Sequence, residues 1–186
     1  MPKTKFYDSG ATGKMNVAGL MSGSGTNLVK IIEHERTMEE DSWSPYRVSV
    51  IFSDRYDSKA NEIGRQFDIP VITRDISAFY RARNRPRSDM EVRAEFDAET
   101  IKSLSPFEID VAAYAGYMSI ATDHLMSAFL GVNVHPGDLR VVNENGRRKY
   151  VGDDAVGVAL RDRSIELRYT THVIEPEVDG GRIFVV

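Results

Sequence analysis

Residues 15–35 read MNVAGLMSGSGTNLVKIIEHE, and this stretch decides the fold class. An apolar run from Met15 to Met21 ends at a turn of small residues, Ser22 to Asn27, and apolar residues then recur at helical spacing from Leu28 to Glu35. An apolar run, a glycine-containing turn and an amphipathic segment, in that order, predict a strand, a tight turn and a helix.

The same alternation continues along the rest of the chain. Further strands are expected at residues 47–52, 69–73, 109–114, 131–134, 167–174 and 183–186, and further helices up to residue 66 and at residues 88–104, 122–129 and 153–163. The segments 74–87, which is rich in arginine, and 137–152, which is rich in turn residues, are interpreted as exposed connections. Strands separated by helices predict an α/β fold with a Rossmann-like, mainly parallel sheet and helices on both faces.

Length and composition bound the class of protein. The chain has 186 residues, of which 41% are hydrophobic and 28% charged, as expected for one globular domain over residues 15–186 after a loose N-terminal arm over 1–14. The net charge of −4 argues against a protein built to hold nucleic acid or an anionic membrane. The absence of cysteine excludes disulfides, thiolate metal sites and a cysteine nucleophile. With no signal peptide and no long apolar run, a cytoplasmic protein without a membrane span is expected.

Three loops of the predicted sheet follow the carboxyl ends of strands, where open α/β sheets bind their ligands. The first is the turn Ser22–Asn27, the second is Ala115-Gly116, and the third is His135-Pro136. Small residues at a helix start, such as Gly25, favour anion binding by backbone N–H groups. The alternative is a tight turn in which Thr26 or Asn27 serves only as the helix N-cap.

Asn133 and His135 are the strongest candidates for chemistry. Because they lie two residues apart on an extended segment, their side chains share one face of the sheet. A carboxylate, Asp179 of the Asp-Gly-Gly turn at 179–181, is available to orient the imidazole or to accept a proton. The alternatives are a structural histidine and a simple turn aspartate.

The other titratable side chains are interpreted as structural. His172 alternates with Thr170 on an expected strand and is predicted to be a core or lining residue, whereas His34 and His124 are predicted to lie on the surface. No spacing among these residues indicates a metal site. The basic segment Arg147-Arg148-Lys149 is interpreted as the solvated tip of a hairpin.

Five segments, in their order along the chain, resemble the folate-dependent formyltransferase family. They are residues 21–28, 52–55, 115–120, 133–136 and 172–181, within a resemblance that runs from about Met15 to the C-terminus. The Gly-x-Gly-Thr-Asn turn is similar to that of the branch that formylates glycinamide ribonucleotide, in which it holds the substrate phosphate.

The resemblance implies a direct transfer, in which the amine of glycinamide ribonucleotide attacks the formyl carbon of 10-formyltetrahydrofolate. Asn133 and protonated His135 would stabilise the oxyanion of the tetrahedral intermediate, and Asp179 would keep His135 charged and assist proton movement. The phosphate would be bound by Gly25, Thr26 and Asn27, and the pterin pocket would be lined by Met118, Ser119, Ile120 and Val178. The folate is a co-substrate, no metal is implied, and the chain would act as a monomer or a homodimer.

The chain also departs from the family pattern. The segment 137–152 is longer, more polar and more basic than the family's Ser-Leu-Leu-Pro continuation, and Asp153-Asp154 stand where a further family histidine is expected. The family has further segments after the position of Val186, which implies either a truncated chain or a divergent relative. The alternatives to glycinamide ribonucleotide formylation are therefore transfer to another amine such as an amino sugar nucleotide, hydrolysis of the formyl folate, and binding without turnover.

Overall fold

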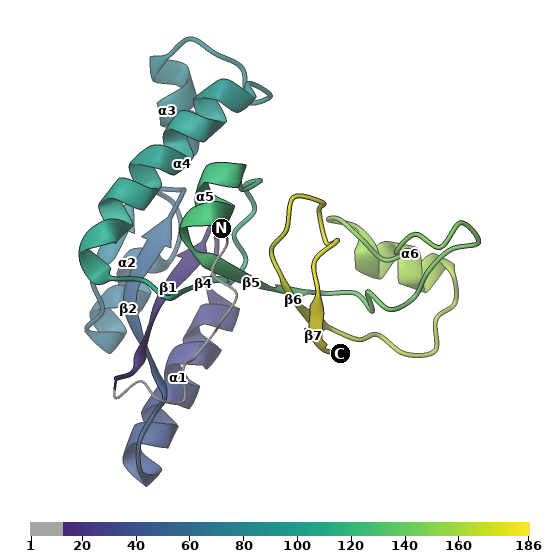
Figure 1. Ribbon diagram of the computed structural model, residues 1–186, viewed down its shortest axis with the longest axis horizontal. Coiled ribbons are helices and arrows are strands. Elements are labelled where there is room, and N and C mark those ends of the chain that lie inside the picture. The colour runs from purple at the N-terminus through teal and green to yellow at the C-terminus, as the bar shows by residue number, and fades with distance from the viewer. Residues whose placement is uncertain (1–12) are drawn as a thin grey trace. The chain divides into compact units, whose positions relative to one another are not determined.

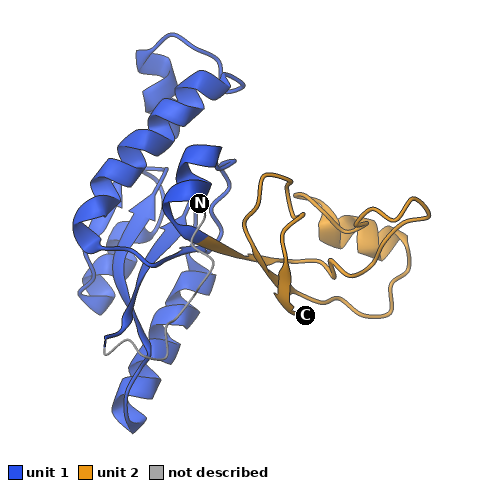
Figure 2. Ribbon diagram, viewed as in Figure 1, with its two compact units in different colours: residues 1–130 blue, residues 131–186 orange. Residues whose placement is uncertain are grey.

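The structure is a computed structural model that describes residues 13–186, so the arm expected over 1–14 lies almost entirely outside the described residues. The chain forms two compact units, which meet in sequence between Leu130 and Gly131 (Figure 2). We call them unit 1 and unit 2. The single catalytic domain expected over 15–186 stays a prediction.

Unit 1 contains a parallel sheet whose strand order is β3-β2-β1-β4 (Figure 1). The strands are β1 (Met15–Met21), β2 (Tyr46–Ser53), β3 (Val71–Thr73) and β4 (Val111–Tyr114). In register, Val17 of β1 pairs with Val48 on one side and with Val111 on the other. The strand, turn and helix predicted over 15–35 are confirmed, because β1 ends at Met21 and the next helix begins at Thr26.

Helices cover both faces of this sheet. They are α1 (Thr26–Asp41), α2 (Ala60–Phe67), α3 (Ile76–Ala82), α4 (Met90–Leu104) and α5 (Asp123–Ala128), with a 3-10 turn at Ser105–Phe107. Ile51 packs with Ile32 of α1 and Ile63 of α2 on one face. Its neighbour Phe52 points to the other face and meets Phe96 of α4 edge-on, with ring centroids 6.3 Å apart. The alternation of side chains along β2 thus fills two separate cores.

Unit 2 is built on antiparallel strands. They are β5 (Leu130–His135), β6 (Thr170–Val173) and β7 (Ile183–Val185), and α6 (Ala155–Arg161) lies between β5 and β6 in the sequence. Residues 137–152 turn back on themselves through a bridge between Val142 and Arg148. The predicted α/β fold is confirmed, and its antiparallel part lies in this unit.

The expected exposed connection over 74–87 is corrected by the structure, because residues 76–82 form α3. Asp75 caps this helix by accepting a hydrogen bond from the N–H of Ala78 at 2.7 Å, and Ile76 and Tyr80, four residues apart, are buried. Four arginines of the segment are exposed as expected, Arg81, Arg83, Arg85 and Arg87, whereas Arg74 is half-buried. The many arginines make the short apolar stripe of α3 hard to detect in the sequence. Between residues 13 and 186 no helix is long and apolar enough to cross a membrane.

Candidate active site

Strand pairing in unit 2 brings Asn133 next to a histidine. Asn133 of β5 lies opposite His172 of β6, and the Asn133 Nδ2 and His172 Nε2 atoms are 3.3 Å apart. His172 Nδ1 lies 2.8 Å from the carbonyl oxygen of Val173, which can only accept, so Nδ1 carries a hydrogen. The Nε2 atom then accepts from the Asn133 amide when the ring is neutral.

Asp179 lies on the loop between β6 and β7 and faces both histidines of the unit. Its Oδ2 is 3.4 Å from His135 Nδ1, and its Oδ1 is 3.5 Å from His172 Nε2. The N–H of Gly152 donates to Oδ2 at 2.7 Å. A protonated His172 can donate to Asp179 in place of accepting from Asn133, so His172 connects the amide with the carboxylate.

His135 is buried and has an acceptor at each ring nitrogen. Its Nε2 donates to the backbone carbonyl of Tyr150 at 2.7 Å, while Nδ1 faces the Asp179 carboxylate. Two acceptors match the ring that carries both hydrogens. Gly137 makes this approach possible, because a β-carbon there would lie 2.7 Å from the Tyr150 oxygen and 2.9 Å from His135 Nε2.

The ionisation of Asp179 is set by competing effects. Burial raises the pKa of Asp179, but the hydrogen bonds with His172 and with the Gly152 N–H, together with the charges of the two histidines, outweigh burial and hold that pKa below its ordinary value. The carboxylate thus lies close to both imidazoles, and the His172 imidazole also contacts the Asn133 amide. Such a group of side chains is suited to acid–base chemistry and to stabilising an oxyanion.

The structure thus brings the three predicted residues of unit 2 together, in one cluster with His172. His172 is 1% exposed, which confirms the prediction of a core or lining residue, and His34 and His124 are exposed as predicted. The contact between His172 and Asn133 is not predicted by the sequence pattern, because it depends on the register of β5 against β6.

The interpretation of residues 147–149 as a solvated tip is wrong for one residue. The predicted hairpin is present, but Arg148 is half-buried and donates from Nη1 to the backbone carbonyl of Asp179. A basic side chain in a polar segment carries no signal for such a contact with a residue 31 positions away in the sequence.

In unit 1, the turn after β1 presents the start of α1. Gly25 is the N-cap, with φ at 67°, and a β-carbon there would lie 2.5 Å from Ile63 Cδ1 and 2.8 Å from Met21 Cε. Thr26 and Asn27 are exposed, and no side chain caps the helix. The alternative in which one of these two residues is the N-cap is therefore wrong, and the first N–H groups of α1 are available to an anion.

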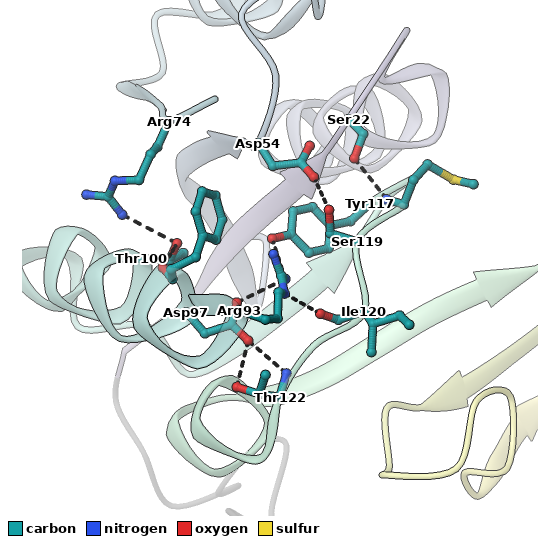
Figure 3. Close-up of polar contacts among 12 residues, drawn as sticks. Ser22, Asp54, Arg74, Arg93, Asp97, Thr100, Tyr117, Ser119, Ile120 and Thr122 are labelled. Atoms are coloured by element: carbon teal, nitrogen blue, oxygen red, sulfur yellow. Dashed lines mark hydrogen bonds and ion pairs between the residues drawn. The ribbon is translucent and has the colours of Figure 1, made fainter. Parts of the chain in front are cut away.

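The loop after β4, also in unit 1, exposes two of the predicted folate-lining residues. The Met118 and Ile120 side chains are 67% and 62% exposed, whereas Ser119 donates to Asp54 Oδ2 at 2.5 Å and the Met118 N–H donates to Ser22 Oγ at 2.8 Å (Figure 3). In unit 2, the Val178 side chain next to Asp179 is exposed as well.

A buried ion pair of α4 holds this loop (Figure 3). Arg93 Nη2 lies 3.0 Å from Asp97 Oδ1, without hydrogen-bond alignment, and the Arg93 guanidinium also donates to the Tyr117 hydroxyl and to the Ile120 carbonyl. Asp97 Oδ2 accepts from both the N–H and the hydroxyl of Thr122. The chain from Tyr117 to Thr122 is therefore tied to α4 at three points.

Replacing Asp97 by asparagine is expected to lower the free energy of unfolding by about 1–3 kcal/mol. Asparagine can still accept from Thr122, but it leaves the buried Arg93 charge without its counter-ion. Urea titration measures the change, with Glu99→Gln on the exposed side of α4 as the control. An unchanged free energy in Asp97→Asn would show that the pair contributes no net stability.

The family model described as "Formyl transferase" matches residues 15–186. The chain belongs to the formyl transferase family. Phosphoribosylglycinamide formyltransferase of Escherichia coli (strain K12) is 29% identical over 173 residues, which cover 92% of this chain and 71% of that protein. Its counterpart from Bacillus subtilis (strain 168) is 27% identical, over 87% of this chain and 72% of that protein.

Solved structures of the formyl transferase family agree with the fold. Glycinamide ribonucleotide transformylase 1 from Symbiobacterium toebii superimposes with a TM-score of 0.75 at 26% identity, over 96% of this chain and 76% of that one. The corresponding enzyme from Geobacillus kaustophilus gives a TM-score of 0.74 at 26% identity, over 93% of this chain and 81% of that one. Within residues 13–186, no group of three or more histidine, cysteine or acidic side chains is placed to hold a metal ion.

Proposed function

We propose that this formyltransferase moves the formyl group of 10-formyltetrahydrofolate to the amine of glycinamide ribonucleotide, a step of purine biosynthesis. The observation that carries the proposal is the cluster of Asn133, His135 and Asp179 in a chain whose relatives are named for this substrate. The folate is a co-substrate that leaves after each turnover.

Each residue of the cluster has a role in this reaction. The amine attacks the formyl carbon, and the formyl oxygen becomes an oxyanion in the tetrahedral intermediate. The Asn133 amide carries two hydrogens, so a bond to His172 uses one and the other can reach the oxyanion. His135 adds positive charge, and Asp179 balances that charge and accepts a proton from the amine, directly or through a water. When the intermediate collapses, the bond between the formyl carbon and N10 of the folate breaks, and the proton taken from the amine passes to N10, so that tetrahydrofolate leaves.

Each unit carries residues to which we assign substrate contacts. The first N–H groups of α1, with Gly25, Thr26 and Asn27, bind the phosphate of the ribonucleotide. We assign contacts with the pterin to Met118, Ser119 and Ile120 in unit 1 and to Val178 in unit 2. The side chains of Met118, Ile120 and Val178 are apolar and exposed, which is consistent with this assignment.

The double substitution Thr26→Ala, Asn27→Ala is expected to raise the KM for glycinamide ribonucleotide about tenfold, because two side-chain donors to the phosphate are lost. The KM for the folate should not change. Steady-state kinetics with either substrate varied measures both values, and Thr37→Ala on the exposed side of the same helix is the control. An unchanged KM for the ribonucleotide would remove the phosphate assignment.

A turnover assay tests the function itself. The absorbance change on deformylation of a 10-formyl folate is followed with and without glycinamide ribonucleotide, in the wild type and in His135→Ala. Turnover that requires the ribonucleotide and is lost in the variant supports the proposal. Consumption of the folate without an acceptor would instead indicate a hydrolase, and transfer only to another amine, such as an amino sugar nucleotide, would reassign the acceptor.

A further inference from the structure

We propose that Arg148 is a positioning residue for formyl transfer. It acts through the backbone of Asp179, which it binds. The inference rests on the function proposed above. It assigns a role to the hairpin, residues 137–152, which departs from the family pattern. Three groups of the hairpin meet the catalytic residues: the Tyr150 carbonyl at His135, the Gly152 N–H at the Asp179 carboxylate, and the Arg148 guanidinium at the Asp179 carbonyl.

Asp179 needs such support because its backbone is left-handed, with φ at 54°. A residue other than glycine keeps this conformation only where its surroundings hold it. The N–H of Gly180 donates to the Glu177 carbonyl at 2.9 Å, and Arg148 holds the carbonyl of Asp179 itself. Rotation of this backbone would swing the carboxylate away from His135 and His172.

The guanidinium fits a positioning role because of where it binds. It donates to the main-chain oxygen of Asp179 and leaves both carboxylate oxygens to His135, His172 and the Gly152 N–H. Those two histidines and Arg148 are the charged or titratable side chains of β5, β6 and the hairpin that face Asp179. A cation on the carboxylate itself would compete with the histidines, and Arg148 avoids that competition.

The hairpin is anchored well enough to serve as a support. Its two arms are joined by backbone hydrogen bonds from Asn143 to Arg147 at 2.8 Å and from Lys149 to Val141 at 2.9 Å. The Lys149 ammonium forms an ion pair with Asp162, which follows α6, at 2.7 Å. The backbone of Arg148 is therefore held on both sides, and its side chain extends from a fixed position.

The test compares Arg148→Gln, Arg148→Lys and the control Arg147→Ala in the full chain. For Arg148→Gln we expect kcat to fall roughly 10- to 100-fold, the effect of losing one charge-assisted hydrogen bond, with each KM nearly unchanged. The acid limb of the kcat profile should move to higher pH, because the Asp179 carboxyl loses the histidine contacts that lower its pKa. Arg148→Lys should restore part of kcat, since an ammonium can donate to the same carbonyl, and Arg147→Ala should behave as the wild type.

The imidazole NMR signals of the four histidines give a readout that does not depend on activity. In Arg148→Gln the signals of His135 and His172 should shift, and those of His34 and His124 should not. Unchanged signals of His135 and His172 overturn the proposal. Shifts of all four histidine signals overturn it as well, because they would show a general loss of structure and hence a merely structural role for Arg148. If the wild type transfers no formyl group, the proposed function fails, and the histidine signals alone decide whether Arg148 positions Asp179.

Discussion

Replacing Asn133 by alanine is expected to lower kcat about 10²- to 10³-fold, with the KM of both substrates nearly unchanged. The amide hydrogen that would meet the oxyanion acts only once negative charge develops on the formyl oxygen, so its loss raises the transition state and not the ground state. Steady-state kinetics with 10-formyltetrahydrofolate and glycinamide ribonucleotide measures the effect.

The control for Asn133→Ala is Asn145→Ala, since Asn145 lies exposed on the hairpin. Asn133→Asp is a second informative variant, because it keeps the size of the side chain and places a negative charge where the oxyanion should form. Near-complete turnover in Asn133→Ala would contradict the oxyanion role and leave Asn133 as a structural partner of His172.

Replacing Asp179 by asparagine is expected to lower kcat about 10²- to 10⁴-fold, the range for loss of a positioned acid–base group. The variant keeps an oxygen for the Gly152 N–H, so the loop should stay folded, but it removes the charge that faces His135 and His172. Glu177→Gln, on the same loop and exposed, is the control. A kcat close to that of the wild type in Asp179→Asn would exclude proton transfer through this carboxyl.

The wild type and Asp179→Asn should also differ in how their stability depends on pH. The pKa of Asp179 is lower in the folded chain than its ordinary value, so the ionised carboxyl stabilises the fold above the unfolded-state pKa, about 3.9, and this contribution is lost as the pH falls through the folded-state value. The wild type should therefore exceed Asp179→Asn in Tm at neutral pH. Thermal unfolding from pH 7 downwards should show the two Tm values converging below about pH 4. If the difference in Tm between the two proteins does not change with pH, the carboxyl charge of Asp179 does not contribute to stability.

Much of the fold could be predicted from local sequence patterns. The apolar run, turn and amphipathic segment over 15–35 specify their conformations through neighbours in the chain, and β1 and α1 lie where expected. The segment over 74–87 was misjudged because α3 has only two buried apolar side chains, Ile76 and Tyr80, among many arginines. In a helix of seven residues with only two buried apolar side chains, the helical periodicity of apolar residues is too weak to be detected in the sequence.

The candidate site, like the fold, has some features that local sequence patterns predict and others that they do not. Alternation along a strand predicts that Asn133 and His135 share a face. Asn133 contacts His172, His135 faces Asp179, and Asp179 lies close to His172 as well. The residues alone leave Asp179 either as a partner of the imidazole or as a plain turn aspartate, and the family resemblance favours the first. His172 and Arg148 had no local signal for their contacts.

The sequence by itself determined the α/β order of the elements, the strand, turn and helix over 15–35, and the position of Asn133 and His135 on the same face of one strand. These depend on the conformation of a few consecutive residues. Only the tertiary structure decided that Asp179 lies between two histidines and that Arg148 holds its backbone. Those contacts depend on the register of β5 against β6 and on hydrogen bonds to a left-handed residue from 31 positions away, and no short stretch of sequence encodes either of them.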